Sequence, residues 1–253
     1  MIDKLTPPWH PGIYVANRHL RWLPTDTKEI FEKMMQDPVH QQYFKEHGWL
    51  DPDAITYNIN SHGFRSDEFT NEPCILALGC SYTVGIGLPV SSIWPTLVGQ
   101  ALNLKVYNLA WGGSSADTCF RLACYWVPQL KPVAVFMLTP PVSRIELLMA
   151  EGNTPPAEVF LPMSESGHFS PNDIYLKHWF INEDNAKINS EKNKLAINAL
   201  CDSNNSKFYS LNSASEMARS REEVGYARDY MHAGVSGHKA VSDKFLKKYY
   251  EQR

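Results

Sequence analysis

Three short segments of the sequence hold residues whose types and spacing could carry out chemistry. The first is residues 79–85, Gly-Cys-Ser-Tyr-Thr-Val-Gly, which places Ser81 directly after a short apolar run. A serine on a turn between a strand and a helix exposes its hydroxyl for nucleophilic attack, and its backbone N–H can face a developing oxyanion. The same position would also suit a serine that only caps the following helix.

The second segment is residues 229–232, Asp-Tyr-Met-His, close to the C-terminus. Two residues three positions apart on a turn lie on one side of it. Asp229 could therefore accept a hydrogen bond from one imidazole nitrogen of His232 while the other nitrogen faces a nucleophile. The alternative is a local Asp–His pair on the surface.

The third segment is residues 108–115, Asn-Leu-Ala-Trp-Gly-Gly-Ser-Ser. A glycine such as Gly113 lets the backbone approach a ligand closely and offers it an N–H group. The alternative is a tight turn that only leads into a helix.

An α/β domain would bring these segments together. Short apolar runs predict buried parallel strands, and apolar residues at helical spacing predict helices between them. The predicted strands are residues 74–79, 105–110, 133–138 and 207–211, and the predicted helices are 91–102, 116–130, 183–202 and 237–250. The alternation indicates a parallel sheet covered on both faces, and ligands bind at the carboxyl ends of such strands.

The chain is expected to form one domain with an extension and an insertion. Residues 1–72 are weakly periodic, with one helix predicted near 27–35, and we expect them to pack on the core as an N-terminal extension. Residues 73–253 hold the α/β pattern. It is broken near 150–180 by glycines and prolines, which predict an insertion.

Taken together and in this order, the three segments resemble those of the SGNH, or GDSL, hydrolases. Residues 79–83 resemble the first block of that family, Gly113 the glycine of the second, and residues 229–234 the last block, usually Asp-x-x-His-Pro. Residues 60–65, Asn-Ser-His-Gly-Phe-Arg, are also similar to a segment that precedes the first block in some members.

The resemblance spans about residue 73 to the C-terminus, and it implies both a fold and a site. The fold would be a flavodoxin-like three-layer α/β/α sandwich with a central parallel sheet. The site would be a Ser81–His232–Asp229 triad, with the N–H groups of Ser81 and Gly113 as the oxyanion hole.

Two positions depart from the family pattern. Cys80 replaces the aspartate of the first block. After the third predicted strand, Pro141 falls near the position of an asparagine whose amide serves the oxyanion, and proline has neither a side-chain donor nor an N–H. Thr139 or Arg144 could replace this oxyanion donor or bind substrate there, although Arg144 could also form an ion pair with a neighbour such as Glu146.

The function that follows is a serine hydrolase for a small-molecule or carbohydrate ester, with a short-chain or sugar O-acyl group. A sugar O-acyltransferase and a catalytically weakened binding protein of the same fold are alternatives. A phosphate or nucleotide binder built on residues 81–85 is a third, but it lacks a P-loop lysine and leaves Asp229 and His232 unexplained.

Composition excludes several other classes of partner. The 253 residues carry a formal net charge of −3 and no run of Lys or Arg, which argues against nucleic acid and anionic membranes. No apolar stretch approaches the roughly 18 residues of a membrane span and the start does not resemble a signal peptide, so we expect a cytoplasmic protein. Five cysteines in apolar segments and the absence of metal-binding spacings predict no disulfide, no metal and no cofactor.

Overall fold

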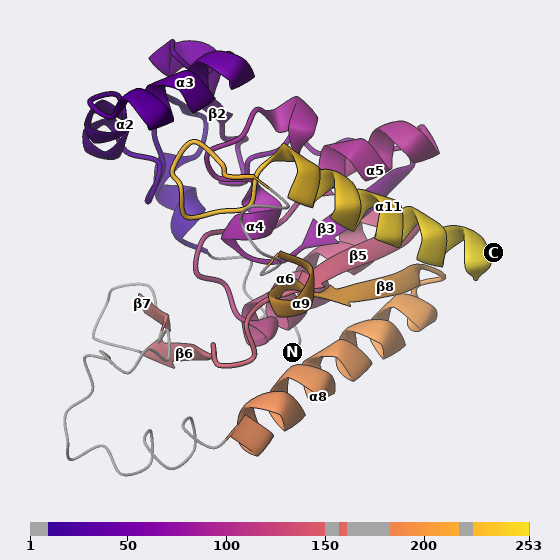
Figure 1. Ribbon diagram of the computed structural model, residues 1–253. Coiled ribbons are helices and arrows are strands. Elements are labelled where there is room, and N and C mark those ends of the chain that lie inside the picture. The colour runs from indigo at the N-terminus through magenta and orange to yellow at the C-terminus, as the bar shows by residue number, and fades with distance from the viewer. Residues whose placement is uncertain (1–9, 150–156, 161–182, 218–224, 253) are drawn as a thin grey trace, which may run out of the picture.

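A four-stranded parallel sheet forms the centre of the computed structural model, which describes residues 10–149, 157–160, 183–217 and 225–252. The strand order is β4-β3-β5-β8 (Figure 1). The strands are β3 (Cys74–Leu78), β4 (Lys105–Asn108), β5 (Ala134–Thr139) and β8 (Lys207–Asn212). All four lie where the apolar runs predict them.

The two central strands are apolar at every position except the last residue of β5, Thr139, because both faces of the sheet are covered. All residues of β3 and β5 are buried. Leu76 and Leu78 face one hydrophobic core, whereas Ile75 and Ala77 face the other. This continuous burial distinguishes them from strands that alternate between apolar and polar residues.

Helices form a layer on each face of the sheet, as predicted (Figure 1). α6 (Ala116–Leu130) and α8 (Glu183–Ser203) cover one face, and α5 (Trp94–Leu102) and α11 (Val235–Glu251) cover the other. The structure therefore confirms a three-layer α/β/α arrangement with a central parallel sheet. No helix in the described part of the chain is both long and apolar enough to cross a membrane.

Residues 10–72 pack over the end of the sheet that carries the short helix α4 (Ser81–Val84) (Figure 1). A third hydrophobic cluster joins Phe31, Phe44 and Ile55 to Val84 and Ala227. The predicted helix is α2 (Lys28–Met34), which Thr27 caps through a hydrogen bond from the N–H of Ile30. The other elements of this segment are η1 (Pro11–Val15), β1 (His19–Leu20), α3 (Pro38–His47), η2 (Pro52–Ala54) and β2 (Tyr57–Asn58).

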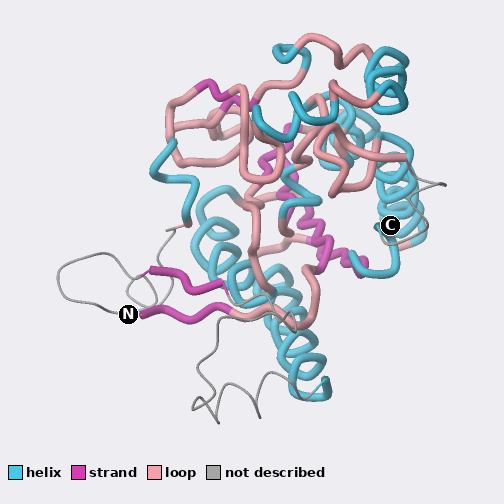
Figure 2. Tube along the Cα trace, turned by 60° about the vertical axis from the view of Figure 1, so that its left-hand side comes forward, coloured by secondary structure: helices cyan, strands magenta, loops and turns pink. Residues whose placement is uncertain are grey.

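The segment after β5 contains a short antiparallel pair, β6 (Glu146–Met149) with β7 (Ala157–Phe160). Figure 2 shows this pair extending away from the central sheet. Most of the insertion expected near 150–180 lies outside the described residues. The remaining short elements are η3 (Val90–Ser92) and α9 (Ser213–Met217).

His238 in α11 is fully buried, and the hydrogen bond that its ring accepts favours the neutral form. Its Nδ1 accepts a hydrogen bond of 3.0 Å from the backbone N–H of Trp94. Burial, followed by the charges of His232 and Arg65, lowers the pKa of His238 to about 3. Protonation would place a hydrogen on Nδ1 and break the bond to Trp94.

We expect His238 to make the protein less stable in mild acid. Its pKa in the folded state lies below the ordinary value of 6.5, so the unfolded chain binds this proton first. Above pH 6.5 the neutral side chain of His238 contributes its stabilisation in full. This stabilisation is lost as the pH falls from about 6.5 toward 3, by up to about 1.4 kcal/mol per pH unit.

Denaturant titrations across this pH range would measure the effect. His238→Asn keeps an oxygen that can accept from Trp94 but does not titrate, so its stability should depend less steeply on pH. His47, which is exposed, provides the control variant His47→Asn. Equal slopes for wild type and His238→Asn would show that His238 is not responsible.

Candidate active site

Ser81 is the first residue of α4, directly after the sharp turn that ends β3. Gly79 makes this turn possible, because a Cβ there would lie 2.0 Å from the Thr83 hydroxyl oxygen. The N-cap is Cys80, whose buried side chain makes no capping hydrogen bond. Ser81 therefore does not cap the helix, and its own N–H lies in the first turn, where helices leave N–H groups without an internal acceptor.

Asn108, the last residue of β4, holds this turn in place through hydrogen bonds, and the chain that follows it leads to Gly113. The Asn108 amide donates to the backbone oxygen of Thr83 at 2.8 Å, and its oxygen accepts from the N–H of Ala110 at 3.1 Å. Gly113 follows with a φ of +83°, a left-handed conformation that favours glycine. The buried side chain of Asn108 thus joins the segment 108–115 to the segment 79–85.

The segment 60–65, whose role the sequence left open, holds the loop after the α4 helix. The Asn60 side-chain oxygen closes its turn by accepting from the N–H groups of His62 and Phe64. The buried guanidinium of Arg65 donates to the backbone oxygens of Val84, Gly85 and Leu88 at 2.7–3.1 Å. Burial lowers the pKa of Arg65 to about 10, so it remains protonated at neutral pH.

Asp229 and His232 form a buried pair before α11. The Nδ1 of His232 lies 2.6 Å from Asp229 Oδ2, while Asp229 Oδ1 accepts from the N–H groups of Met231 at 3.0 Å and His232 at 3.1 Å. The exposed fractions are 1% for Asp229 and 9% for His232, so this is not a pair on the surface. Nε2 is therefore the ring nitrogen of His232 that is not bonded to Asp229.

Hydrogen bonds keep Asp229 ionised despite its burial. Burial alone would raise the pKa of this carboxyl, but the bonds from His232, Thr25 and Met231 outweigh it and hold the pKa below its usual value. The carboxylate is therefore charged throughout the neutral range. A charged carboxylate fixes the proton of His232 on Nδ1 and leaves Nε2 as an acceptor.

Thr25 contacts this pair from the N-terminal segment, and sequence reasoning did not single it out. Its hydroxyl donates to Asp229 Oδ2 at 2.7 Å across 204 positions of sequence. Its φ is +75°, a left-handed conformation that is strained for a β-branched residue. Neither the contact nor the strain has a local sequence signal.

A second buried ion pair fixes the loop that carries Asp229. Arg228 is fully buried and donates to both carboxylate oxygens of Asp26, at 2.9 and 2.7 Å. Asp26 also accepts from the Tyr57 hydroxyl, which in turn accepts from the N–H of Gly87 at 2.8 Å. Residues near the N-terminus thus hold both the loop before His232 and the loop after Ser81.

A pocket of about 340 Å³ brings four of the predicted site residues together: Ser81, Gly113, Arg144 and His232. Asp229 lies behind His232 and does not line it. Thr139 is not among the lining residues either; it is buried at the end of β5. The other lining residues are Leu23, Pro24, Thr25, Tyr82, Val84, Ile86, Trp111, Gly112 and Met231.

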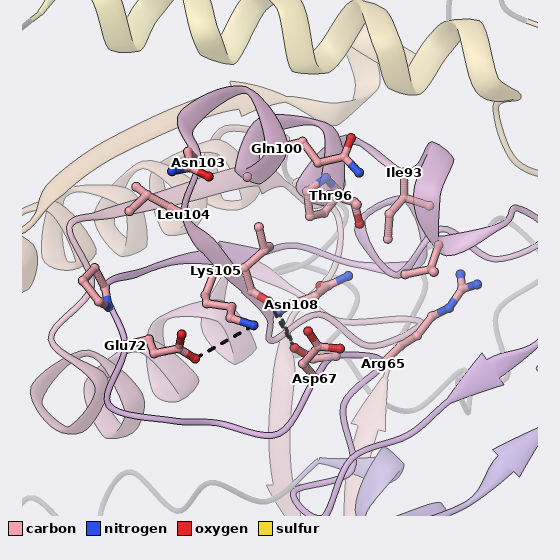
Figure 3. Close-up of a pocket in the computed structure, with 16 residues that line it drawn as sticks. Arg65, Asp67, Glu72, Ile93, Thr96, Gln100, Asn103, Leu104, Lys105 and Asn108 are labelled. Atoms are coloured by element: carbon pink, nitrogen blue, oxygen red, sulfur yellow. Dashed lines mark hydrogen bonds and ion pairs between the residues drawn. The ribbon is translucent and has the colours of Figure 1, made fainter.

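A larger cavity of about 690 Å³ lies beside the edge strand β4 (Figure 3). Its polar lining includes Arg65, Asp67, Glu72 and Lys105, of which Lys105 and Glu72 are 3.9 Å apart. No histidine lines it, and its one serine, Ser66, has its hydroxyl bonded to the backbone of β4. The lining of this cavity therefore does not pair a serine with a histidine.

Comparisons with known proteins give structural similarities only. No protein-family model and no curated protein sequence matches the chain. The similar solved structures include the psychrotrophic esterase EstA from Pseudoalteromonas sp., inhibited by monoethylphosphonate (11% identity, TM-score 0.36, 72% of this chain and 100% of that one).

Two further structures are similar to the same degree. One is the acetyl xylan esterase Est2A from Butyrivibrio proteoclasticus (11% identity, TM-score 0.34, 78% of this chain and 66% of that one). The other is a putative acylhydrolase from Bacteroides fragilis (12% identity, TM-score 0.33, 84% and 95%). Similarity at this level carries no argument about activity, which has to come from the residues of the pocket.

Proposed function

We propose that this protein is a serine hydrolase that cleaves a small ester, with Ser81 as nucleophile, His232 as general base and acid, and Asp229 as the group that orients His232. The observation that supports it most is the pocket lined by both Ser81 and His232, with Asp229 hydrogen-bonded to the far nitrogen of that histidine. A nucleophile, a base and a buried carboxylate in this order are the parts that nucleophilic acyl transfer needs.

In the first half of the reaction, Ser81 Oγ attacks the ester carbonyl carbon while His232 Nε2 takes the hydroxyl proton. The carbonyl oxygen becomes an oxyanion, which the N–H groups of Ser81 and Gly113 would stabilise. The intermediate collapses with cleavage of the bond between the acyl carbon and the alkoxy oxygen. His232 returns its proton to the departing alcohol, and the acyl group stays on Ser81.

In the second half, water replaces the alcohol. His232 Nε2 takes one proton from water as its oxygen attacks the acyl carbon, and the bond to Ser81 Oγ breaks with return of that proton to the serine. The products are one carboxylic acid and one alcohol per ester. The pocket volume of about 340 Å³ is at the small end for ligand sites, which favours a short acyl group or a single sugar unit.

Labelling with a fluorophosphonate tests the nucleophile directly. Ser81 Oγ would displace fluoride from phosphorus and gain the phosphonyl mass, so intact-mass analysis and peptide mapping should place the label on Ser81. Ser81→Ala should remain unlabelled, while the exposed control Ser91→Ala should label like wild type. An unlabelled wild type, or a label on another serine, would refute the proposal.

We predict that Thr25 supports turnover by positioning Asp229. Thr25→Val removes the hydroxyl that donates to Asp229 but keeps the shape of the side chain, and a hydrogen bond to a charged group contributes about 1.5–3 kcal/mol. Turnover of a short-chain ester should fall by about 10-fold or more, whereas Thr25→Ser should retain most of it.

The variant Thr25→Gly distinguishes the role of Thr25 in positioning Asp229 from its effect on the stability of the fold. It should relieve the strain of the positive φ and raise the unfolding midpoint above that of Thr25→Val, yet turn over as slowly as that variant. Wild-type turnover in Thr25→Val would show that the contact with Asp229 has no role in the reaction.

A further inference from the structure

The guanidinium of Arg144 lines the same pocket as Ser81 and His232 without a partner in the described part of the chain. Its Nη1 is buried and has no hydrogen-bond acceptor there. The neighbouring carboxylate does not neutralise it, because Glu146 pairs instead with Arg121, which donates from Nε at 2.8 Å. The expected alternative, an ion pair between Arg144 and Glu146, is therefore not formed.

The position of Arg144 follows from the turn that ends β5. Two prolines follow Thr139, and the N–H of Arg144 donates to the backbone oxygen of Pro141 at 3.0 Å. Glu146, anchored by Arg121 and by its own N–H on Asp117 at 3.2 Å, fixes the chain just beyond the turn. Arg144 is thus held at the pocket by contacts on both sides of it.

The described lining of the pocket contains one permanently charged side chain, that of Arg144, and no carboxylate. The nearest carboxylate in the site, Asp229, lies behind His232 and already accepts from Thr25, His232 and two backbone N–H groups. A guanidinium whose Nη1 is shielded from water and has no hydrogen-bond acceptor destabilises the protein until an anion binds it. The pocket is therefore complementary to negative charge.

We propose that the natural substrate is a small ester that carries an anionic group, such as a carboxylate, and that Arg144 binds this group through charge-assisted hydrogen bonds. This inference rests on the proposed ester hydrolysis and names its substrate class. Apolar walls formed by Val84, Ile86 and Trp111 would accommodate the carbon chain between the ester and the anion. Arg144 would then be a specificity residue rather than a replacement for the missing oxyanion donor.

Matched pairs of anionic and neutral esters test the proposal. Monoethyl and diethyl succinate differ in the charge on the acyl side, with ethanol release as the readout. O-acetylglycolate and O-acetylglycolamide differ in the charge on the alcohol side, with acetate release as the readout. For at least one pair, wild type should favour the anionic ester in kcat/KM, and Arg144→Ala should reduce that preference by about 10- to 100-fold.

Variants separate the possible roles of Arg144. Arg144→Lys should recover part of the preference, because it keeps the charge but loses the planar fork. The exposed Arg18 provides a control, since Arg18→Ala removes the same charge from the surface and should leave the preference unchanged. The unfolding midpoint of each variant, measured on the same sample, identifies any loss that comes from misfolding.

The remaining outcomes would overturn the proposal. An equal loss for charged and neutral esters in Arg144→Ala would place the guanidinium on the reacting carbonyl instead. An unchanged preference would remove Arg144 from substrate binding. Absence of Ser81-dependent turnover of all four esters, together with failure of fluorophosphonate labelling, would refute the proposed function itself. Labelling at Ser81 without a preference for the anionic esters would refute only the substrate class.

Discussion

Replacing Ser81 by alanine is expected to lower the turnover of a short-chain nitrophenyl ester by at least about 10⁴-fold, because the variant lacks the atom that would form the acyl-enzyme. The thermal midpoint should change little. The described residues give Ser81 Oγ no hydrogen-bond partner, and the adjacent turn is held by Gly79 and Asn108 rather than by the serine hydroxyl. Loss of one unpaired oxygen removes little stabilisation.

Two controls make this result specific to the nucleophile. Ser91→Ala removes an exposed serine that does not line the pocket and should retain full activity. His232→Gln should also abolish turnover while leaving Ser81 in place. If Ser81→Ala kept more than a tenth of the wild-type rate with an unchanged midpoint, another residue would have to be the nucleophile.

The strands and helices of the core could be predicted because their signals are local. β3 and β5 are continuous apolar runs, as both faces of the sheet are buried, and α6 begins after Ser115, whose hydroxyl accepts from the N–H of Thr118. α3 was not predicted, since its apolar face is short and weak. Its boundaries are nevertheless marked in the sequence by Asp37 and Pro38 at the start and Gly48 at the end.

The site was only partly predictable, because several contacts that hold it in place join residues far apart in the sequence. The motifs identified Ser81, Gly113, Asp229 and His232. The structure places Ser81, Gly113 and His232 in the lining of one pocket and Asp229 behind His232, and their catalytic roles are still predictions. The bond from Thr25 to Asp229 spans 204 positions and that from Arg228 to Asp26 spans 202. Such contacts depend on how the N-terminal segment folds back, and no spacing within a motif encodes them.

Replacing Asp229 by asparagine is expected to lower kcat by about 10⁴-fold while leaving the fold intact. Asp229 Oδ1 accepts from two backbone N–H groups, so the amide oxygen of an asparagine has to occupy that position. The amide nitrogen would then face His232 Nδ1 and donate to it. This fixes the imidazole proton on Nε2, where the ring is unable to accept the proton of Ser81.

The tautomer change gives a readout independent of turnover. In wild type and in Ser81→Ala, the short bond of 2.6 Å between His232 Nδ1 and Asp229 Oδ2 should produce a strongly deshielded imidazole proton in the NMR spectrum. That signal should be absent from Asp229→Asn, whose unfolding midpoint should remain close to that of wild type. Near-normal turnover by a folded Asp229→Asn variant would mean that the carboxylate does not orient His232. If the signal persisted and the rate still fell, the carboxylate would act by its charge alone rather than by selecting the tautomer.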